Sequence, residues 1–548
     1  MASFATKTLS LVSLLGASLQ VTGLLASLLF VAGPANADVA ESSPLPQSLS
    51  SLPQTIERAL NTFNTPGIAV GILHEGKTAY LAGHGLRDVT SNAPVTPETY
   101  FYLASVSKAF TAASLGILVQ DNKLSWDDKV IDHLPAFQLA DPWVTREFTI
   151  RDMLTHRSGL ASGAGDSMLW PAPSRFSRDE VIYNLRFLSP QTSFRSQFAY
   201  SNVMYIAASA VADNLYDGEW AELVEQRLFQ PLAMSCFAAG LPERATDNVA
   251  NGYGYSEDRG LYAIHRNDVS EDSRVWSAAG AITCNAHDML KWLSMWLARG
   301  RTPDGQTLFE ESTVDAMLSA VTPLSVSSVD QQWFNTEYSG YALGWRVTDQ
   351  FSHNVISHTG TISGFQTFVA FVPAKNLGIV LLNNGSDYGT RGAIMQTILQ
   401  AYLEPGTEQR DWIAAYADFQ KDRQARFLAS YQKPHGSGTV LLATSEYLGQ
   451  FTDRWFGGMT VFKENDRVRI RSEKMPTLTG TLTPFEDHTF VIRWDNEDAM
   501  EDAFIHFSVS TQRRVTGFTL YPYTLKEKSN HAYRDMRFTR SEKIKIND

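Results

Sequence analysis

The chain has 548 residues, with 46 Lys and Arg against 58 Asp and Glu, and its length suggests about two to four domains. Its 44% hydrophobic and 11% aromatic residues are enough to build apolar cores, which excludes a disordered chain. The formal net charge of −12 argues against nucleic acid or an anionic membrane as a partner, because both require a basic surface. Two cysteines exclude a disulfide-built scaffold and a four-cysteine zinc site.

Residues 1–37 have the pattern of a secretory signal peptide. Lys7 is their only charged residue, and a run of apolar and small residues extends from Leu9 to Ala32. The end Ala35-Asn36-Ala37 matches the small-residue cleavage pattern, so we expect cleavage after Ala37 and a secreted or periplasmic protein. The apolar run is longer than usual, which leaves an uncleaved membrane anchor as the alternative. No later stretch is apolar enough to span a bilayer, so no other membrane contact is expected.

The first part of the mature chain alternates strand and helix patterns. The apolar run Ile68 to Leu73, the turn Glu75-Gly76 and the run Thr78 to Leu81 predict a hairpin. Further predicted elements are helices over Ala109–Gln120, Val203–Leu215 and Asp288–Ala298, and strands over Tyr341–Val347, Gln366–Val372 and Gly378–Leu382. Strands at both ends with helices between them predict an α+β domain whose sheet uses both ends of the segment.

The pattern changes near Glu404. A charged amphipathic helix is predicted over Asp411–Tyr431, and the polar stretch Lys433–Gly438 is typical of a linker. From Leu441 onward, short alternating strands are separated by turn residues about every ten positions, which predicts a small C-terminal antiparallel β-barrel. We therefore assign residues 406–440 to the helix and linker and residues 441–548 to a barrel domain that is separable by proteolysis at the linker.

The first chemical motif is Ser105-Val106-Ser107-Lys108, directly before an apolar helix. Residues three apart on a helix face the same way, so Lys108 is expected beside the Ser105 hydroxyl. A serine becomes a good nucleophile when a neighbouring base takes its proton, and a buried lysine amine can be that base. Alone, the motif is weak, because the same pattern also fits a solvated serine and lysine on an ordinary helix.

Two further motifs follow in the chain. In Tyr200-Ser201-Asn202, the phenol can transfer a proton and the amide of Asn202 offers a donor and an acceptor. In His358-Thr359-Gly360, followed by Thr361, glycine permits close approach, and an edge strand here could pair with an extended substrate. Each motif alone also fits a structural role, as a helix cap or as a half-buried histidine at a turn.

Together, the three motifs in this order resemble the serine hydrolases of the class C β-lactamase and penicillin-binding protein superfamily. The resemblance covers residues 52–405, and it extends to Phe101–Phe110, Asn122–Trp126, Leu134-Pro135, Thr149–Leu160 and Ser277–Ala281. It implies a β-lactamase-like catalytic domain of α/β/α type without a metal or another cofactor.

The resemblance also implies a role for each motif residue. Ser105 would be the acylated nucleophile, Lys108 its partner base, Tyr200 a general base and acid, and Asn202 a substrate-orienting amide. The third motif, from His358 to Thr361, would line the substrate, and the backbone N–H groups of Ser105 and Thr361 would form the oxyanion hole. Whether Lys108 or Tyr200 is the primary base stays open.

One position departs from the β-lactamase members, which have Lys-Thr-Gly where this chain has His358. Histidine there is similar to the D-amino-acid-directed peptidases and carboxypeptidases of the same superfamily. An imidazole titrates near pH ~6.5, so we expect its charge to help hold a substrate carboxylate below that pH. The C-terminal barrel is similar to the lipocalin-like domain that follows some of these peptidases.

The sequence therefore predicts an exported serine hydrolase that forms an acyl-enzyme on amide or ester bonds, with small peptides or D-amino-acid derivatives as the leading substrate class. A carboxylesterase or weak β-lactamase on the same fold is one alternative, and a catalytically silent binding protein is another. In an exported protein, Cys236 and Cys284 are candidates for one disulfide, and two separate buried thiols are the alternative.

Overall fold

The computed structural model of the chain describes residues 43–240, 246–264, 275–431, 433–496, 501–523 and 533–541. The expected signal peptide, residues 1–37, and its cleavage site lie outside the described residues. Among the helices that are described, none is both long and apolar enough to cross a bilayer.

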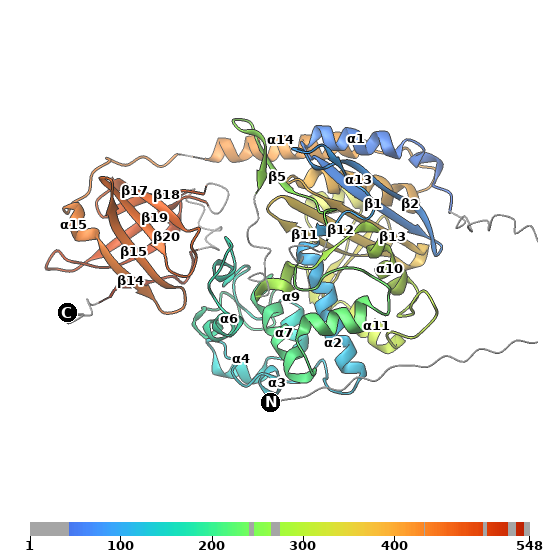
Figure 1. Cartoon of the computed structure of the whole chain (residues 1–548), viewed down its shortest axis with the longest axis horizontal. Helices are drawn as coiled ribbons and strands as arrows, with labels where there is room; N and C mark the ends of the chain where they lie inside the picture. The colour runs from blue at the N-terminus through green and yellow to red at the C-terminus, as the bar shows by residue number, and fades with distance from the viewer. Residues whose placement is uncertain are drawn as a thin grey trace, which may run out of the picture. The chain divides into compact units, whose positions relative to one another are not determined.

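A large sheet of nine strands forms the centre of the first domain (Figure 1). All of its pairings are antiparallel. The strands, in spatial order, are β3 (Ala93–Pro94), β2 (Lys77–Asp88), β1 (Gly67–His74), β13 (Leu377–Asn383), β12 (Phe365–Val372), β11 (His353–Ile362), β10 (Arg346–Gln350), β9 (Ser339–Tyr341) and β8 (Thr322–Pro323). Strand β1 pairs with β13, so the two ends of the domain meet in the middle of the sheet, as the sequence pattern predicts.

Helices cover both faces of this sheet, which explains why its central strands are continuously apolar. On one face lie α1 (Leu52–Thr62), α13 (Tyr388–Leu403) and α14 (Trp412–Ser430), which pack against one another (Figure 1). On the other face, α10 (Ala286–Leu297) packs on β1, β12 and β13. Alternate residues of β13 divide between the two cores, Ile379 and Leu381 on the first face and Val380 and Leu382 on the second.

A helical region adjoins the second face and contributes to the site. It contains α2 (Ser107–Gln120), α5 (Ile150–Leu154), α6 (Arg178–Asn184), α7 (Asn202–Leu215) and α9 (Ser277–Gly280). Helix α2 packs against α7 and α9, and nearly all of its side chains are buried. The α+β class that the sequence predicts is thus confirmed. One predicted strand, Tyr341–Val347, is divided between β9 and β10 by a break at Gly344, whose φ of 79° is left-handed.

The C-terminal region is a closed antiparallel barrel, as predicted, and it is drawn in orange to red in Figure 1. Its strands are β14 (Gly449–Asp453), β15 (Gly457–Glu464), β16 (Arg467–Ser472), β17 (Thr479–Glu486), β18 (Thr489–Trp494), β19 (Ala503–Val509), β20 (Val515–Pro522) and β21 (Phe538–Arg540). Aromatic side chains fill the interior, among them Phe451, Phe507 and Phe518. Because the barrel is closed, each of its described strands pairs with a neighbour on both sides.

The barrel contacts the first domain through the segment around α6. The Asn184 side-chain amide donates to the Trp455 carbonyl at 2.8 Å, and Lys474 forms an ion pair with Glu180 at 2.5 Å. The Thr477 hydroxyl donates to the Pro171 carbonyl at 3.0 Å. The first bond holds the turn between β14 and β15 against α6, and the other two hold the turn between β16 and β17 against Glu180 and Pro171.

Candidate active site

Ser105 lies in a short 3-10 turn, Ala104–Val106, immediately before α2. Ala104 has a φ of 48°, a backbone conformation that is uncommon for alanine and that recurs at functional sites. From the first turn of α2, the Lys108 ammonium nitrogen donates to Ser105 Oγ at 3.2 Å. The Ser-x-x-Lys spacing therefore places the lysine beside the serine hydroxyl, as the helical period predicts.

Two more acceptors hold the Lys108 amine. It donates to Asn202 Oδ1 at 2.7 Å and to the Ala279 carbonyl of α9 at 2.6 Å. The side chain is fully buried, and this burial lowers the pKa of Lys108 to about 7, while the Asp166 carboxylate opposes the shift. At neutral pH a large fraction of Lys108 is therefore an uncharged amine, which can accept a proton.

The second motif lies on a loop that ends at the start of α7. His156 supports this loop, because its Nδ1 accepts from the Ser201 backbone N–H at 3.0 Å and its ring packs 4.4 Å from the Tyr200 ring. The Lys108 nitrogen lies 4.8 Å from the centre of the Tyr200 ring. Burial raises the pKa of Tyr200 well above 10, although the Ser105 hydroxyl acts in the opposite direction. The Tyr200 phenol thus stays protonated near neutral pH.

The third motif lies on the second half of β11. Strand β10 pairs with β11 only as far as Ser357, so the stretch from His358 to Ile362 forms a local edge although β11 is an inner strand of the sheet. A side chain at Gly360 would overlap the Leu103 carbonyl oxygen, which explains the glycine. This close approach brings the edge against the residues that precede Ser105.

His358 is buried and held by two hydrogen bonds. Its Nδ1 is 2.8 Å from the Thr359 carbonyl and its Nε2 is 2.9 Å from the Tyr341 hydroxyl. A carbonyl only accepts, so Nδ1 carries the proton and Nε2 of the neutral ring accepts from Tyr341. Burial, with the nearby charges of Arg346 and Lys108, lowers the pKa of His358 well below 6.5. The expectation that a charged His358 holds a substrate carboxylate is therefore wrong.

The three motifs converge on a cavity of about 670 Å³. Its lining includes Ser105, Tyr200, Asn202 and the stretch of β11 with His358, Thr359 and Thr361. Gly360 and Lys108 lie behind this wall, where Gly360 sets the backbone approach and Lys108 contacts Ser105 from the protein interior.

Several lining residues were not identified from the sequence. They are Asp166, the tryptophans Trp170 and Trp276, Arg346 on β10, and Thr477 and Asn496 from the barrel. Asp166 follows a glycine-containing loop and carries no local motif, so only the fold brings it to the site. The local signal for Arg346 is its place in the hairpin that leads to the third motif, where it pairs with Ser357.

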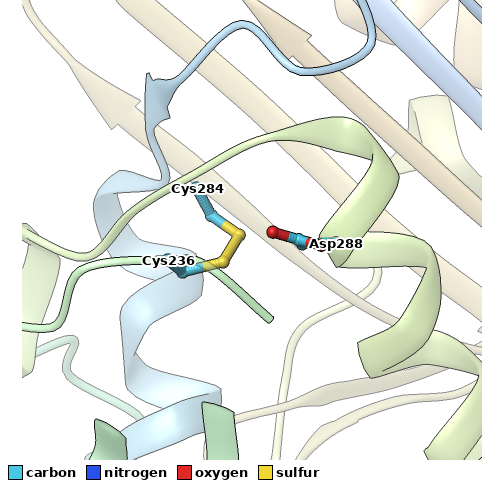
Figure 2. Close-up of side chains that lie close together, drawn as sticks. All are labelled: Cys236, Cys284 and Asp288. Carbon is cyan, nitrogen blue, oxygen red and sulfur yellow. A yellow bond between two sulfur atoms is a disulfide. The ribbon is translucent and has the colours of Figure 1, made fainter. Parts of the chain in front are cut away.

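Cys236 and Cys284 form a disulfide with a Cα–Cα distance of 4.5 Å (Figure 2). Asp288 lies beside it, so these three residues form a cluster that could be taken for a metal site. The sulfurs are bonded to each other, however, and Asp288 accepts hydrogen bonds from Ser235, Asn285 and Lys291. The donor set therefore fits a structural cross-link, which fixes β7 (Thr283–Cys284), the strand that follows α9 in the chain.

This fold and this arrangement of residues define a β-lactamase-like domain. Residues 52–402 match the beta-lactamase family model, so the chain belongs to the beta-lactamase family, a family of serine hydrolases. Residues 437–540 match a separate model described as a domain of unknown function, DUF3471.

Individual relatives share about a quarter of their aligned residues with this chain. The chain is 27% identical over 475 residues to unguisins hydrolase ungD' of Aspergillus campestris, covering 82% of this chain and 84% of the relative. It is 24% identical over 339 residues to protein flp of Staphylococcus aureus, covering 61% and 62%. The octameric penicillin-binding protein homologue from Pyrococcus abyssi is similar in structure, with a TM-score of 0.58 at 18% identity over 90% of this chain and 100% of that chain. This structural similarity shows the fold alone.

Proposed function

We propose that the protein is an exported serine hydrolase that cleaves amide or ester bonds through an acyl-enzyme, with short peptides or D-amino-acid derivatives as substrates. The observation that carries this proposal is the buried Lys108 amine 3.2 Å from Ser105 Oγ, at the wall of a cavity large enough for such a substrate. A binding protein has no need of a buried lysine beside a serine, because burial of that amine destabilises the fold. The relative from Aspergillus campestris, which is named a hydrolase, also supports the proposal.

In the first step, neutral Lys108 takes the proton of Ser105 while Ser105 Oγ attacks the carbonyl carbon. The opposite directions of the two pKa shifts favour Lys108 over Tyr200 as the base of the resting enzyme. The negative charge on the carbonyl oxygen would be stabilised by the backbone N–H groups of Ser105 and Thr361.

Tyr200 suits the second proton transfer. As a protonated phenol, it can donate to the leaving amine or alcohol when the carbonyl–leaving-group bond breaks, and Lys108 can return its proton to Tyr200. Water then attacks the carbonyl carbon of the acyl-enzyme, and one of the two groups takes a proton from this water. The same group passes the proton to Ser105 Oγ as the bond between Oγ and the acyl carbon breaks, which releases the acid and restores the hydroxyl. Asn202 would orient the substrate acyl group from its place between Lys108 and Asp166.

Arg346 supplies the permanent positive charge that neutral His358 lacks. It lines the cavity beside the β11 edge, where the leaving group of an extended substrate would lie. The proposed carboxylate interaction is therefore assigned to Arg346. Export fits the Cys236–Cys284 disulfide, since disulfides persist mainly in oxidising compartments.

Labelling of the purified protein with a fluorophosphonate probe tests the proposal, with intact-protein mass spectrometry as the readout. We expect one added probe per chain, none in Ser105→Ala, and unchanged labelling in Ser430→Ala, which alters an exposed serine at the end of α14. Absence of labelling in the wild type, or equal labelling of Ser105→Ala, would refute the proposed nucleophile. Efficient turnover of a penicillin by the wild type would favour a β-lactamase over a peptidase.

A further inference from the structure

The catalytic cavity contains one acidic and one basic side chain that the acylation chemistry does not use. Among the described residues that line it, Asp166 is the one acidic side chain and Arg346 is the one arginine or lysine. His358 adds no charge at neutral pH, because its pKa is held well below 6.5. A substrate that fills this cavity therefore meets an acid at one place on the wall and a guanidinium at another.

Asp166 is only partly satisfied by the protein. Its Oδ2 accepts from the Asn202 side-chain amide at 2.9 Å, whereas Oδ1 is buried and has no hydrogen-bond partner among the described residues. The carboxyl opens the 3-10 turn Asp166–Met168, after Gly165 with a φ of 84°. Burial raises the pKa of Asp166 to about 7, because a charged carboxylate without a donor on Oδ1 is unfavourable. A cationic donor supplied by a ligand would stabilise the charged form and would therefore be bound strongly.

The position of Asp166 in the cavity indicates which part of the substrate its carboxyl group would contact. Asn202 bridges the two groups, since its Oδ1 accepts from Lys108 at 2.7 Å while its Nδ2 donates to Asp166. Asp166 thus lies two hydrogen bonds from the amine that contacts Ser105, on the Asn202 side of the cavity. This is the side on which the acyl group lies in the proposed reaction, whereas Arg346 lies by the β11 edge, on the leaving-group side.

We propose that Asp166 binds the free ammonium group of the residue that supplies the acyl group, and so selects substrates with an unblocked amino terminus. This inference rests on the proposed function, because it assumes that an acyl group is held beside Asn202. An ammonium group provides up to three donors and a full positive charge, and charge-assisted hydrogen bonds are the stronger kind. Arg346 would hold the carboxylate of a short leaving group, so that unblocked small peptides fit both charges.

A purely structural role for Asp166 makes a different prediction. If Asp166 only orients Asn202, its removal should slow every substrate by the same factor, because Asn202 acts on the acyl group whether or not it has an amine. Asp166→Asn separates the two roles, since the new side-chain oxygen can still accept from Asn202 but no longer carries a charge. The informative quantity is the ratio between two substrates that differ only in the charge of the amine.

The test compares alanine p-nitroanilide with its N-acetylated form, each in the D and the L configuration. We expect kcat/KM of the wild type to favour the free-amine substrate, and this preference to fall about tenfold to hundredfold in Asp166→Asn. Asp422→Asn, which alters an exposed carboxylate on α14, should keep the wild-type ratio. An unchanged ratio in Asp166→Asn, or a wild-type preference for the acetylated substrate in both configurations, would overturn the inference.

A binding measurement separates failure of this inference from failure of the proposed function. Ser105→Ala protein is titrated calorimetrically with alaninamide and with N-acetylalaninamide, which requires no turnover. We expect alaninamide to bind more tightly and Asp166→Asn in this background to abolish the difference. Equal binding of the two amides would refute the role of Asp166 even if fluorophosphonate labels Ser105, whereas selective binding without labelling would refute the chemistry alone.

Discussion

Replacement of Lys108 by arginine tests the base that the structure favours. An ordinary lysine with a pKa of 10.5 is uncharged in only about 1 molecule in 3,000 at pH 7, whereas the lowered pKa of about 7 leaves about half uncharged. The fold thus supplies on the order of 10³ times more neutral amine. Arginine keeps the charge and the hydrogen-bond donors but is never neutral at this pH. We therefore expect Lys108→Arg to lose about 10³-fold or more in kcat/KM.

The assay is hydrolysis of an uncharged p-nitrophenyl ester between pH 5 and 9. Protonated Lys108 is inactive as a base, so wild-type kcat/KM should rise about tenfold per pH unit below about 7 and level off above it. Lys123→Arg, which alters an exposed lysine in the turn after α2, should retain this profile, and circular dichroism should show that Lys108→Arg is folded. A folded Lys108→Arg within tenfold of the wild type would refute the assignment.

Three more outcomes follow from the same geometry. Gly360→Ala should lower both the melting temperature and the activity, because the added methyl group overlaps the backbone. In the control Gly280→Ala, the nearest atom lies 3.5 Å from the methyl group, so this variant should melt near the wild type, and equal melting temperatures of the two variants would contradict the steric argument. Cys236→Ser should lower the free energy of unfolding by about 2–4 kcal/mol in denaturant titrations, since the cross-link closes a separation of 48 residues, and no change would mean that the disulfide does not form in solution. The pH profile of His358→Asn should keep the inflection near pH 7, whatever the remaining rate, because a neutral His358 does not cause this inflection. Loss of the inflection in this variant would assign it to the imidazole of His358 instead of the amine of Lys108.

Much of the fold could be predicted from local patterns. Apolar runs such as Ile68 to Leu73 and Gly378 to Leu382 indicate strands buried on both faces, and the strand rhythm after Leu441 indicates a barrel. The break at Gly344 was missed because a single glycine inside an apolar stretch gives a weak signal. The pairing order of the strands depends on contacts between distant segments, which no short window contains.

The sequence by itself determined the three motifs and their order, because a helical period places Lys108 beside Ser105 whatever surrounds them. Only the tertiary structure decided the protonation states, since burial lowers the pKa of Lys108 to about 7 and leaves His358 neutral. Only the structure brought Asp166 and Arg346 into the cavity with Ser105. A pKa and a cavity wall are set by neighbours that are remote in the chain, so both follow from packing and not from spacing along the sequence.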